Sequence, residues 1–437
     1  MDGNRKILVI NYYWPPSGGA AVQRWLALCN LLAEMGWEVS VLTVDEQYAT
    51  YQVYDTSLTA AIRADIKVYT TRTLEPFGIF KLLFGKKSMP KPAFADGRKP
   101  GLANKIGRFV RGNIFVPDPR KYWKYFAVSK ARELITTQDI HLVVTAGPPH
   151  STHFIGQQLK KTLPIRWICD FHDLWTDIIF YNLLYKLPIT KRMEKQLEKK
   201  ILENCDGILT VGEGYKAKLL SKSDKLSPEK ISIVPIGYDE NMFLREDTPS
   251  ATPVFTITYV GTIAAYYQPE VFFQAVKQLI SKYPHAPVRL LFVGVVPPDM
   301  FNSIEAHGLA AVWDYKAYVP HAEAVAYMKK ATVLLLVNPV TPDEEMVIPG
   351  KLYEYMASKR PVINITSLKS ETAAIIARCN AGRTFDRSML APLTAYLESL
   401  LLQWLDKGAV IQDFNEAAIA GYSQRAIATH LSDYLSA

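Results

Sequence analysis

Short apolar runs alternate with segments of helical periodicity in both halves of this 437-residue chain. Short apolar runs bounded by turn residues are typical of buried strands. In the first half we expect strands over residues 6–11, 37–43, 141–145, 165–171, 207–211 and 231–235, and helices over 20–35, 123–135, 191–203 and after Pro149. A strand, a helix and another strand in succession favour parallel pairing with right-handed crossovers. The first half therefore predicts a Rossmann-like sheet.

The second half repeats the pattern. Its expected strands cover residues 256–260, 288–293, 333–337 and 362–365, and its expected helices cover 269–283 and 351–357. The prediction is an α/β protein with two Rossmann-like domains, 1–240 and 241–420, that face each other across a cleft. Ligands of such sheets bind outside the carboxyl ends of the strands. A terminal segment, 421–437, is expected to form a helix that packs back on the first domain.

Composition places the chain among soluble globular proteins, because 49% of its residues are hydrophobic and 21% are charged. A chain of this length exceeds one ordinary hydrophobic core. No apolar run reaches the roughly 20 residues that span a bilayer, and the first residues lead directly into a strand rather than a signal peptide. We therefore expect a cytoplasmic protein. The four cysteines lack paired spacing, so the sequence indicates neither a disulfide framework nor a zinc site.

The positive charge is concentrated in one segment. Fourteen lysines and arginines lie between Lys81 and Arg132, opposed by two aspartates, whereas the whole chain has a net charge of +8. Aromatic and aliphatic residues lie among these cations, as in helices that rest on an anionic membrane. A solvated insertion or a nucleic-acid patch would have a similar composition. We favour a membrane surface and expect no nucleic-acid partner. The insertion, about 73–130, is expected to contact membrane or acceptor through Lys86, Lys87, Lys91, Arg108 and Arg111.

A Pro-Gly break precedes the expected helix that begins at Lys351. The first N–H groups of a helix have no partner within it, and with the helix dipole they can hold a phosphate. Lys351 and Glu354 are three residues apart and share one helix face. The lysine could neutralise a leaving diphosphate, and the glutamate could accept hydrogen bonds from both ribose hydroxyls. An ordinary helix start with an exposed salt bridge would have the same spacing.

Two motifs in the first half follow expected strands. Gly18 and Gly19 lie in a loop that opens a helix, where glycine lets a ligand approach the backbone. Asp170, His172 and Asp173 cluster where another strand ends. An imidazole can bind a sugar hydroxyl or move a proton, and a neighbouring carboxylate can orient it. A loop histidine whose hydrogen bonds are satisfied by an aspartate is the alternative.

Further residues at strand ends have weaker signals. Gly261 could admit a diphosphate to the backbone, whereas Gly294 is expected to relieve crowding. The segment around Val319 could present backbone groups to the edge of a base. His150 and His153 are expected to begin helices or to pack in the core.

Three segments together resemble a known family. They are Tyr-Val-Gly-Thr at 259–262, Pro-Ile-Gly-Tyr-Asp-Glu-Asn-Met-Phe at 235–243, and Pro-Gly-Lys-Leu-Tyr-Glu-Tyr-Met-Ala at 349–357. In this combination the chain resembles the family-4 retaining glycosyltransferases of GT-B fold over nearly its whole length. Pro-Asp-Pro-Arg at 117–120 and Asp-Phe-His-Asp-Leu-Trp at 170–175 are similar to segments of bacterial enzymes that build cell-surface polysaccharides.

The resemblance implies an activity and its partners. The first domain would bind the acceptor, a lipid-linked or polysaccharide glycan at the inner face of the membrane. The second would bind a nucleotide-sugar, UDP- or GDP-linked, without a cofactor or an essential metal. The implied catalytic residues are His172, Asp173 and Lys351. The implied donor-binding residues are Gly18, Gly19, Gly261, Thr262, Val319, Glu345, Lys351, Leu352 and Glu354.

The chain departs from the family pattern in two places. The family has two glutamates separated by seven residues, but the position that matches the first glutamate is Met346. Glu344 and Glu345 precede it, and we expect Glu345 to serve, although Glu344 is the alternative. The family also has an arginine and a lysine shortly after Tyr-Val-Gly-Thr, whereas residues 263–270 contain no cation. Lys351 must then supply more of the charge stabilisation of a leaving diphosphate.

Three other functions fit parts of the sequence. An NAD-dependent dehydrogenase could use the first strand, loop and helix together with Asp45, but the GxGxxG spacing is missing. A nucleotide-sugar epimerase of the same two-domain build would need no acceptor. A non-catalytic sugar-binding protein is the third alternative, but such proteins usually function outside the cytoplasm.

Overall fold

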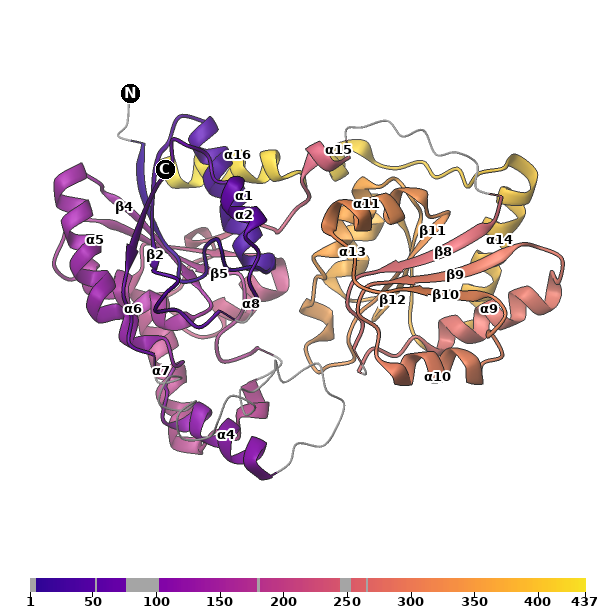
Figure 1. Ribbon diagram of the computed structural model, residues 1–437, viewed down its shortest axis with the longest axis horizontal. Helices are drawn as coiled ribbons and strands as arrows, with labels where there is room; N and C mark the ends of the chain where they lie inside the picture. Colours follow the sequence, from indigo (N-terminus) through magenta and orange to yellow (C-terminus); the bar gives the residue numbers. More distant parts are fainter. Residues whose placement is uncertain (1–4, 52, 76–101, 179–180, 244–252, 265) are drawn as a thin grey trace. The chain divides into compact units, whose positions relative to one another are not determined.

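The protein was analysed as a computed structural model, which describes all residues except 1–4, 52, 76–101, 179–180, 244–252 and 265. The chain divides into two compact units (Figure 1). The first unit comprises Met1–Pro235 and Ile427–Ala437, and the second comprises Ile236–Ala426. Each unit contains one parallel sheet with helices on both faces.

The sheet of the first unit has the strand order β3-β2-β1-β4-β5-β6-β7 within the described residues. Every neighbouring pair is parallel. The strands are β1 (Lys6–Ile10), β2 (Glu38–Val44), β3 (Lys67–Thr71), β4 (Leu142–Gly147), β5 (Arg166–Phe171), β6 (Gly207–Thr210) and β7 (Ile231–Ile233). The helices are α1 (Ala20–Glu34), α2 (Ser57–Ala60), α4 (Leu102–Asn113), α5 (Lys124–Gln138), α6 (His153–Lys160), α7 (Pro188–Asn204), α8 (Glu213–Leu220) and α16 (Gln424–Ser436).

Both faces of this sheet are buried, which explains why its strands are continuously apolar rather than alternating. Successive side chains of β1 point to opposite faces. Leu8 and Ile10 belong to the core layer covered by α5, α6 and α7. Ile7 and Val9 belong to the opposite layer, where α1 and α16 pack.

The sheet of the second unit has the strand order β10-β9-β8-β11-β12-β13. All of its pairs are parallel. The strands are β8 (Phe255–Val260), β9 (Val288–Val293), β10 (Trp313–Lys316), β11 (Val333–Val337), β12 (Val362–Ile365) and β13 (Gly382–Phe385). The helices are α9 (Glu270–Lys282), α10 (Pro298–Ala306), α11 (His321–Lys330), α12 (Lys351–Ala357), α13 (Glu371–Arg378), α14 (Leu390–Lys407) and α15 (Glu416–Ala420).

The last helix returns to the first unit, as the sequence predicted. Ile427, Ala428, Leu431 and Leu435 of α16 are buried in the layer that also contains Trp25 of α1. Polar contacts fix the same helix, because the Trp37 indole N–H donates to the Ser432 hydroxyl at 2.9 Å and Arg166 donates to the carbonyls of Tyr434 and Leu435. These contacts tie the carboxyl end of the chain to strands near its beginning.

The predicted α/β class with two Rossmann-like parallel sheets is confirmed. The sequence analysis missed three strands, β3, β10 and β13. Each lies at an edge of its sheet. An edge strand has a neighbour on one side only, so it keeps polar and exposed residues such as Lys67, Lys316 and Arg383. The missing strands therefore lacked the apolar run that marked the central strands.

Candidate active site

Lys351 lies against the loop that follows β8. A Cβ on Gly261 would lie 2.8 Å from the Lys351 Nζ, and Gly261 has a φ of 117°. The ammonium donates to the Tyr259 hydroxyl at 2.7 Å and to the Thr262 carbonyl at 3.4 Å, and it lies 4.1 Å from the centre of the Tyr259 ring. The backbone conformation favours glycine at 261, and a side chain there would displace the end of the lysine.

The Lys351 side chain makes no ion pair within the described part of the chain, since both of its hydrogen bonds go to uncharged oxygens. Burial lowers the pKa of Lys351 to about 7, and the charge of Glu354 offsets this effect only in part. The side chain nevertheless keeps partial exposure to solvent. A partly buried cation beside a glycine turn can accommodate an anion such as a phosphate.

The start of α12 contributes less than expected. The Leu352 N–H donates to the Pro349 carbonyl at 2.9 Å, and the Tyr353 N–H contacts the Gly350 carbonyl at 3.4 Å. Two of the first N–H groups of this seven-residue helix are therefore already paired, contrary to the expectation that they would be open. The ammonium of Lys351, rather than the helix dipole, must supply most of the positive charge.

Glu354 lies one turn after Lys351, as the spacing predicted, but it does not pair with that lysine. Its Oε1 is 2.6 Å from Nε2 of His321, the first residue of α11. This hydrogen bond raises the pKa of His321 above its ordinary value, against the opposing effect of burial. A ribose that binds Glu354 would meet a carboxylate already oriented by an imidazole.

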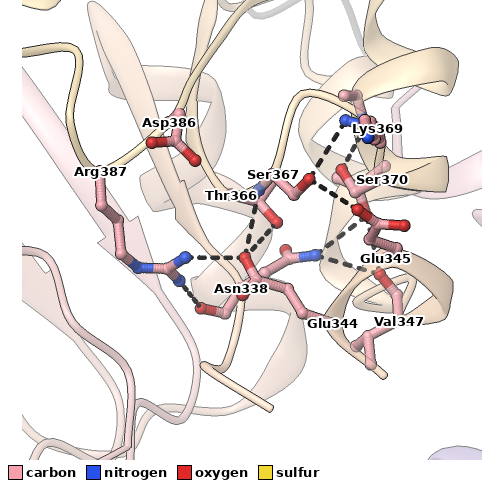
Figure 2. Close-up of polar contacts among 12 residues, drawn as sticks. Asn338, Glu344, Glu345, Val347, Thr366, Ser367, Lys369, Ser370, Asp386 and Arg387 are labelled. Atoms are coloured by element: carbon pink, nitrogen blue, oxygen red, sulfur yellow. Dashed lines mark hydrogen bonds and ion pairs between the residues drawn. The ribbon is translucent and has the colours of Figure 1, made fainter. Parts of the chain in front are cut away.

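The two consecutive glutamates before α12 have different surroundings (Figure 2). Glu344 accepts hydrogen bonds at one oxygen from the Thr366 hydroxyl, the Ser367 N–H and the Arg387 guanidinium. Glu345 is exposed and accepts one hydrogen bond, from the Ser367 hydroxyl at 3.0 Å. Both belong to the short 3-10 helix Glu344–Met346.

Other residues predicted at the donor site differ in accessibility. The Thr262 side chain is exposed and its carbonyl accepts from Lys351 and from the Tyr259 hydroxyl. Val319 and Leu352 are buried in one core layer of the second unit, so only their backbone groups could reach a ligand. Gly294 has the predicted packing role, because a Cβ there would lie 2.4 Å from the Gly261 carbonyl oxygen.

Asp170 connects His172 to the first helix. Its Oδ2 accepts from Arg24 at 2.8 Å, from the Trp25 indole at 2.7 Å, and lies 2.8 Å from the His172 Nδ1. Burial raises the pKa of Asp170, but Arg24 and His172 outweigh it and hold that pKa at about 2. The carboxylate fixes the orientation of the imidazole, and the buried Nε2 of His172 has no hydrogen-bond partner among the described residues.

Asp173 is not the residue that orients His172, since Asp170 occupies that position. The sequence analysis placed Asp170 in this cluster but did not select it. Asp170 is the second-last residue of β5 and is completely buried. The sequence alone does not distinguish this position from the neighbouring core positions of the strand. Arg24 was missed because a cation on a helix is ordinarily exposed, whereas Arg24 is 3% exposed.

The other glycines and histidines that the sequence analysis noted in the first unit differ in their contacts. Gly18 packs against the loop at Val53, where a Cβ would lie 2.9 Å from the valine side chain, whereas a Cβ on Gly19 would meet nothing within 4 Å. His150 and His153 are buried and stack with Phe171, as expected of packing residues. Burial lowers the pKa of His153 to about 3, so this ring stays neutral.

A surface of exposed apolar and basic residues extends over α4, residues 183–187 and α7. The Asn113 side chain, at the end of α4, accepts from the Leu187 N–H at 2.8 Å and from the Thr190 hydroxyl at 2.9 Å. The exposed apolar members are Ile106, Phe109, Ile114, Leu183, Tyr185, Leu187, Ile189 and Met193, and the exposed cations are Lys105, Arg111, Arg192, Lys195, Lys199 and Lys200. We call this set the α4–α7 surface.

Charge is segregated across α7. Two of its three carboxylates, Glu194 and Glu198, point into the first unit, where both are completely buried. The third, Glu203, is partly exposed and lies 3.8 Å from the Lys199 ammonium. Glu194 pairs with the Lys186 ammonium and accepts from the Tyr181 hydroxyl. The outward side of α7 therefore presents cations among exposed apolar side chains.

Some predictions for the basic insertion cannot be followed in the structure. Lys86, Lys87 and Lys91 lie outside the described residues, whereas Arg108 and Arg111 belong to α4. No helix in the described part of the chain has the length and apolarity needed to cross a membrane. Among the described residues, no group of three or more histidine, cysteine, aspartate or glutamate side chains could hold a metal ion.

Two protein-family models match the sequence. The model described as Glycosyltransferase Family 4 matches residues 90–241, and the one described as Glycosyl transferases group 1 matches residues 254–401. Together they account for more than half of the chain. A search of curated proteins finds no match.

Three solved structures illustrate the similarity in fold. Anabaena HepE in complex with UDP-glucose is 12% identical, with 99% of each chain covered and a TM-score of 0.60. TarM of S. aureus, in a complex containing UDP, is 10% identical, with 99% of this chain and 100% of that chain covered and a TM-score of 0.59. WaaG, a glycosyltransferase involved in lipopolysaccharide biosynthesis, is 14% identical, with coverage of 98% and 95% and a TM-score of 0.52.

These structures share the arrangement of two parallel sheets described above. The family matches extend over both units, and both are to glycosyltransferase models rather than to a dehydrogenase. The chain belongs to the family-4 retaining glycosyltransferases of GT-B fold.

Proposed function

We propose that this enzyme transfers a sugar from a UDP-linked donor to a lipid-linked or polysaccharide acceptor during synthesis of a cell-surface glycan. The second unit would bind the donor and the first unit the acceptor. Lys351 is the observation that carries the donor assignment. It is a cation without an acidic partner in the described structure, held beside the left-handed turn at Gly261.

The proposed step is a displacement with retention of configuration. The bond between the anomeric carbon and the phosphate oxygen breaks, and the acceptor oxygen bonds to that carbon on the same face. The departing phosphate gains negative charge, which Lys351 would stabilise because its ammonium is partly removed from solvent. The phosphate oxygen lies on the attacked face and would accept the proton of the acceptor hydroxyl. No metal is required in this step.

The other site residues have roles in binding. Glu354 would accept from the ribose hydroxyls, with its second oxygen held by His321. Glu345 would contact the donor sugar, and Gly261 and Thr262 would contact the diphosphate through the backbone. His172 would contact the transferring sugar through Nε2, because Asp170 occupies Nδ1. Gly18 and Gly19 would contact the donor through the backbone. Asp173 is retained as a proposed catalytic residue.

UDP is preferred to other nucleotides on the basis of similar proteins. The structure of HepE contains UDP-glucose, and that of TarM contains UDP. The cell-surface assignment is supported in the same way by WaaG, which is involved in lipopolysaccharide biosynthesis. The identities are below 25%, so these proteins suggest the donor and the pathway class.

The acceptor is proposed to be reached at the inner face of an anionic membrane. The α4–α7 surface combines exposed apolar side chains with cations, and each cation near an anionic leaflet contributes about 1 kcal/mol. Lys86, Lys87 and Lys91 would add to this attraction. The protein would then be peripheral and cytoplasmic, and its acceptor would be anchored in the same membrane.

A donor panel tests the proposal. Nucleotide release is measured with UDP-, GDP- and ADP-sugars, with and without lipid-linked glycans extracted from bacterial membranes. We expect acceptor-dependent release of UDP by the wild type and by Lys330→Ala, a control at an exposed lysine of the same unit, and almost none by Lys351→Ala. Release from GDP-sugars alone would reject the UDP assignment. Sugar interconversion without an acceptor would instead identify an epimerase.

A further inference from the structure

Arg387 lies two residues beyond the end of β13 and holds two points of a single loop (Figure 2). Its Nη1 donates to the Glu344 carboxylate at 2.8 Å, and its Nη2 donates to the Asn338 carbonyl at 2.9 Å. Asn338 is the first residue after β11, and Glu344 lies six residues further along the loop that leads to α12. The guanidinium therefore sets the distance between the start and the middle of the loop 338–350.

The Glu344 Oε1 that accepts from Arg387 also accepts two other hydrogen bonds. The same oxygen accepts from the Thr366 hydroxyl at 2.7 Å and from the Ser367 N–H at 3.2 Å, both at the end of β12. The side chain is 12% exposed, and that of Arg387 is 23% exposed. Three neighbouring strand ends, those of β11, β12 and β13, are thus joined by one ion pair.

The next residue has the opposite environment. Glu345 is exposed and makes a single hydrogen bond, to Ser367. Because consecutive residues of a short helix diverge in direction, a fixed Glu344 determines where Glu345 points. Arg387 itself does not face the Lys351 site, since β13 is separated from β8 by β11 and β12.

The end of the loop near Lys351 has a separate anchor. The Val347 carbonyl accepts from the Asn338 amide at 3.1 Å and from the Thr372 hydroxyl at 2.9 Å. Loss of Arg387 would therefore release the part of the loop around Glu345 while leaving the approach to Lys351 held.

We propose that Arg387 is a positioning residue that acts through Glu344 to direct Glu345 toward the donor sugar. The role of Glu345 rests on the proposed function, whereas the clamp of Arg387 on the loop does not. Arginine suits this position because its planar group makes the two hydrogen bonds from separate nitrogens held in a fixed geometry, whereas a lysine donates from a single nitrogen.

Hydrogen exchange in the full-length protein tests the clamp without any ligand. Arg387→Met should increase exchange in residues 338–346 about 10-fold or more, because hydrogen bonds to charged groups of this kind commonly change an equilibrium by that factor. Arg383→Met, which removes an exposed arginine of β13, is the matched control and should leave the loop unchanged. If Arg387→Met does not fold, Arg387→Lys is used and should give a smaller increase. Exchange equal to the control would overturn the clamp.

A mutant cycle tests whether the arginine acts through Glu344. The double variant Arg387→Met with Glu344→Gln should exchange no faster than Arg387→Met alone, since both remove the same contact. Additive increases would show independent roles and overturn the coupling.

Binding of UDP and of UDP-glucose tests the consequence for the donor sugar. In Arg387→Met the affinity for UDP should stay within about 3-fold of the wild type, while the affinity for UDP-glucose falls about 10-fold, as in Glu345→Gln. Equal losses for both ligands would refute the link to the sugar. Wild-type protein that binds neither ligand would contradict the proposed donor, and the exchange experiment would still decide the clamp.

Discussion

Lys351 combines features that are costly in the absence of a ligand. Its ammonium is partly buried, and its hydrogen-bond partners in the described structure are uncharged. With a pKa of about 7 the lysine is charged in about half of the molecules at pH 7, and a bound anion favours its charged form. The sequence predicted the phosphate role of Lys351 from its position after Pro349 and Gly350, but not its contact with Tyr259, because that contact joins residues 92 positions apart.

The first prediction concerns Gly261→Ala. A methyl group there would lie 2.8 Å from the Lys351 Nζ, so the ammonium must move away from the turn. We expect the affinity for UDP to fall about 10-fold. The positive φ should also lower the free energy of unfolding by about 1–3 kcal/mol, because alanine is strained there. Gly408→Ala is the control, because Gly408 also has a positive φ but nothing lies within 4 Å of the added atom. Titration calorimetry measures the affinity. Equal UDP affinity in both variants would contradict the contact.

The second prediction is a pH dependence of UDP binding. UDP prefers the charged lysine, and the pKa of Lys351 in the free protein is about 7 because of burial. As the pH rises above 7 the free protein loses this proton first, so the affinity should fall by up to about tenfold per pH unit between pH 7 and 9. Calorimetry in buffers of different ionisation enthalpy should show proton uptake on binding. A Lys351→Ala variant should lack both effects, and a flat wild-type profile would argue against the lysine as phosphate ligand.

At the scale of elements, the central strands were predictable and the connections between strand ends were not. Parallel strands such as β4 and β11 are buried on both faces and have continuous apolar sequences. Arg387 was missed because nothing in its local sequence marks it. Its partners, Glu344 and Asn338, are 43 and 49 residues away and meet it only through the strand order. Asp170 was noticed for its neighbours, yet its pairing with Arg24 spans 146 residues.

The third prediction concerns this buried pair, which joins α1 to the end of β5. Asp170→Asn leaves Arg24 without its anionic partner and should lower the free energy of unfolding of the first unit by about 3–5 kcal/mol. Denaturation is followed by tryptophan fluorescence, because six of the eight tryptophans lie in this unit. Asp173→Asn, which lacks these contacts, is the control and should change stability by less than about 0.5 kcal/mol.

The pair also predicts how stability depends on acid. The pKa of Asp170 in the folded protein is about 2, below its ordinary value of 3.8, because Arg24 and His172 outweigh the effect of burial. A lowered pKa stabilises the fold above pH 4, and this stabilisation is lost as the pH falls toward 2. The wild type should therefore lose about 2 kcal/mol more than Asp170→Asn over this range. Equal losses of stability in the wild type and in Asp170→Asn would contradict the lowered pKa of Asp170.

At the scale of the whole molecule, the last helix joins the two ends of the sequence. Residues of α16 pack beside α1 and complete one face of the first sheet. The fourth prediction is that Leu431→Ala, at a fully buried position, lowers the free energy of unfolding of the first unit by about 2–5 kcal/mol. Leu402→Ala, at an exposed leucine of α14, should have little effect. Equal stability of the two variants would show that α16 is dispensable.

The α4–α7 surface gives the fifth prediction. Replacement of Arg192, Lys199 and Lys200 by glutamate reverses three exposed charges and should weaken binding to vesicles of 30% phosphatidylserine by ~100-fold or more, at about 1 kcal/mol per cation. The control reverses Arg5, Lys67 and Lys161, which are exposed residues of the same unit outside this surface. Cosedimentation measures both variants. A loss of equal size in the control would indicate net charge rather than a defined surface.

The central claim is that one lysine in the second unit binds the diphosphate of the donor. Calorimetric titration of UDP into the wild type, Lys351→Ala and Lys330→Ala at pH 7 tests it most directly. We predict that Lys351→Ala loses at least about 30-fold in affinity, as expected for a lost charged hydrogen bond to phosphate, while Lys330→Ala binds like the wild type. Unchanged UDP affinity in a folded Lys351→Ala protein would contradict the account.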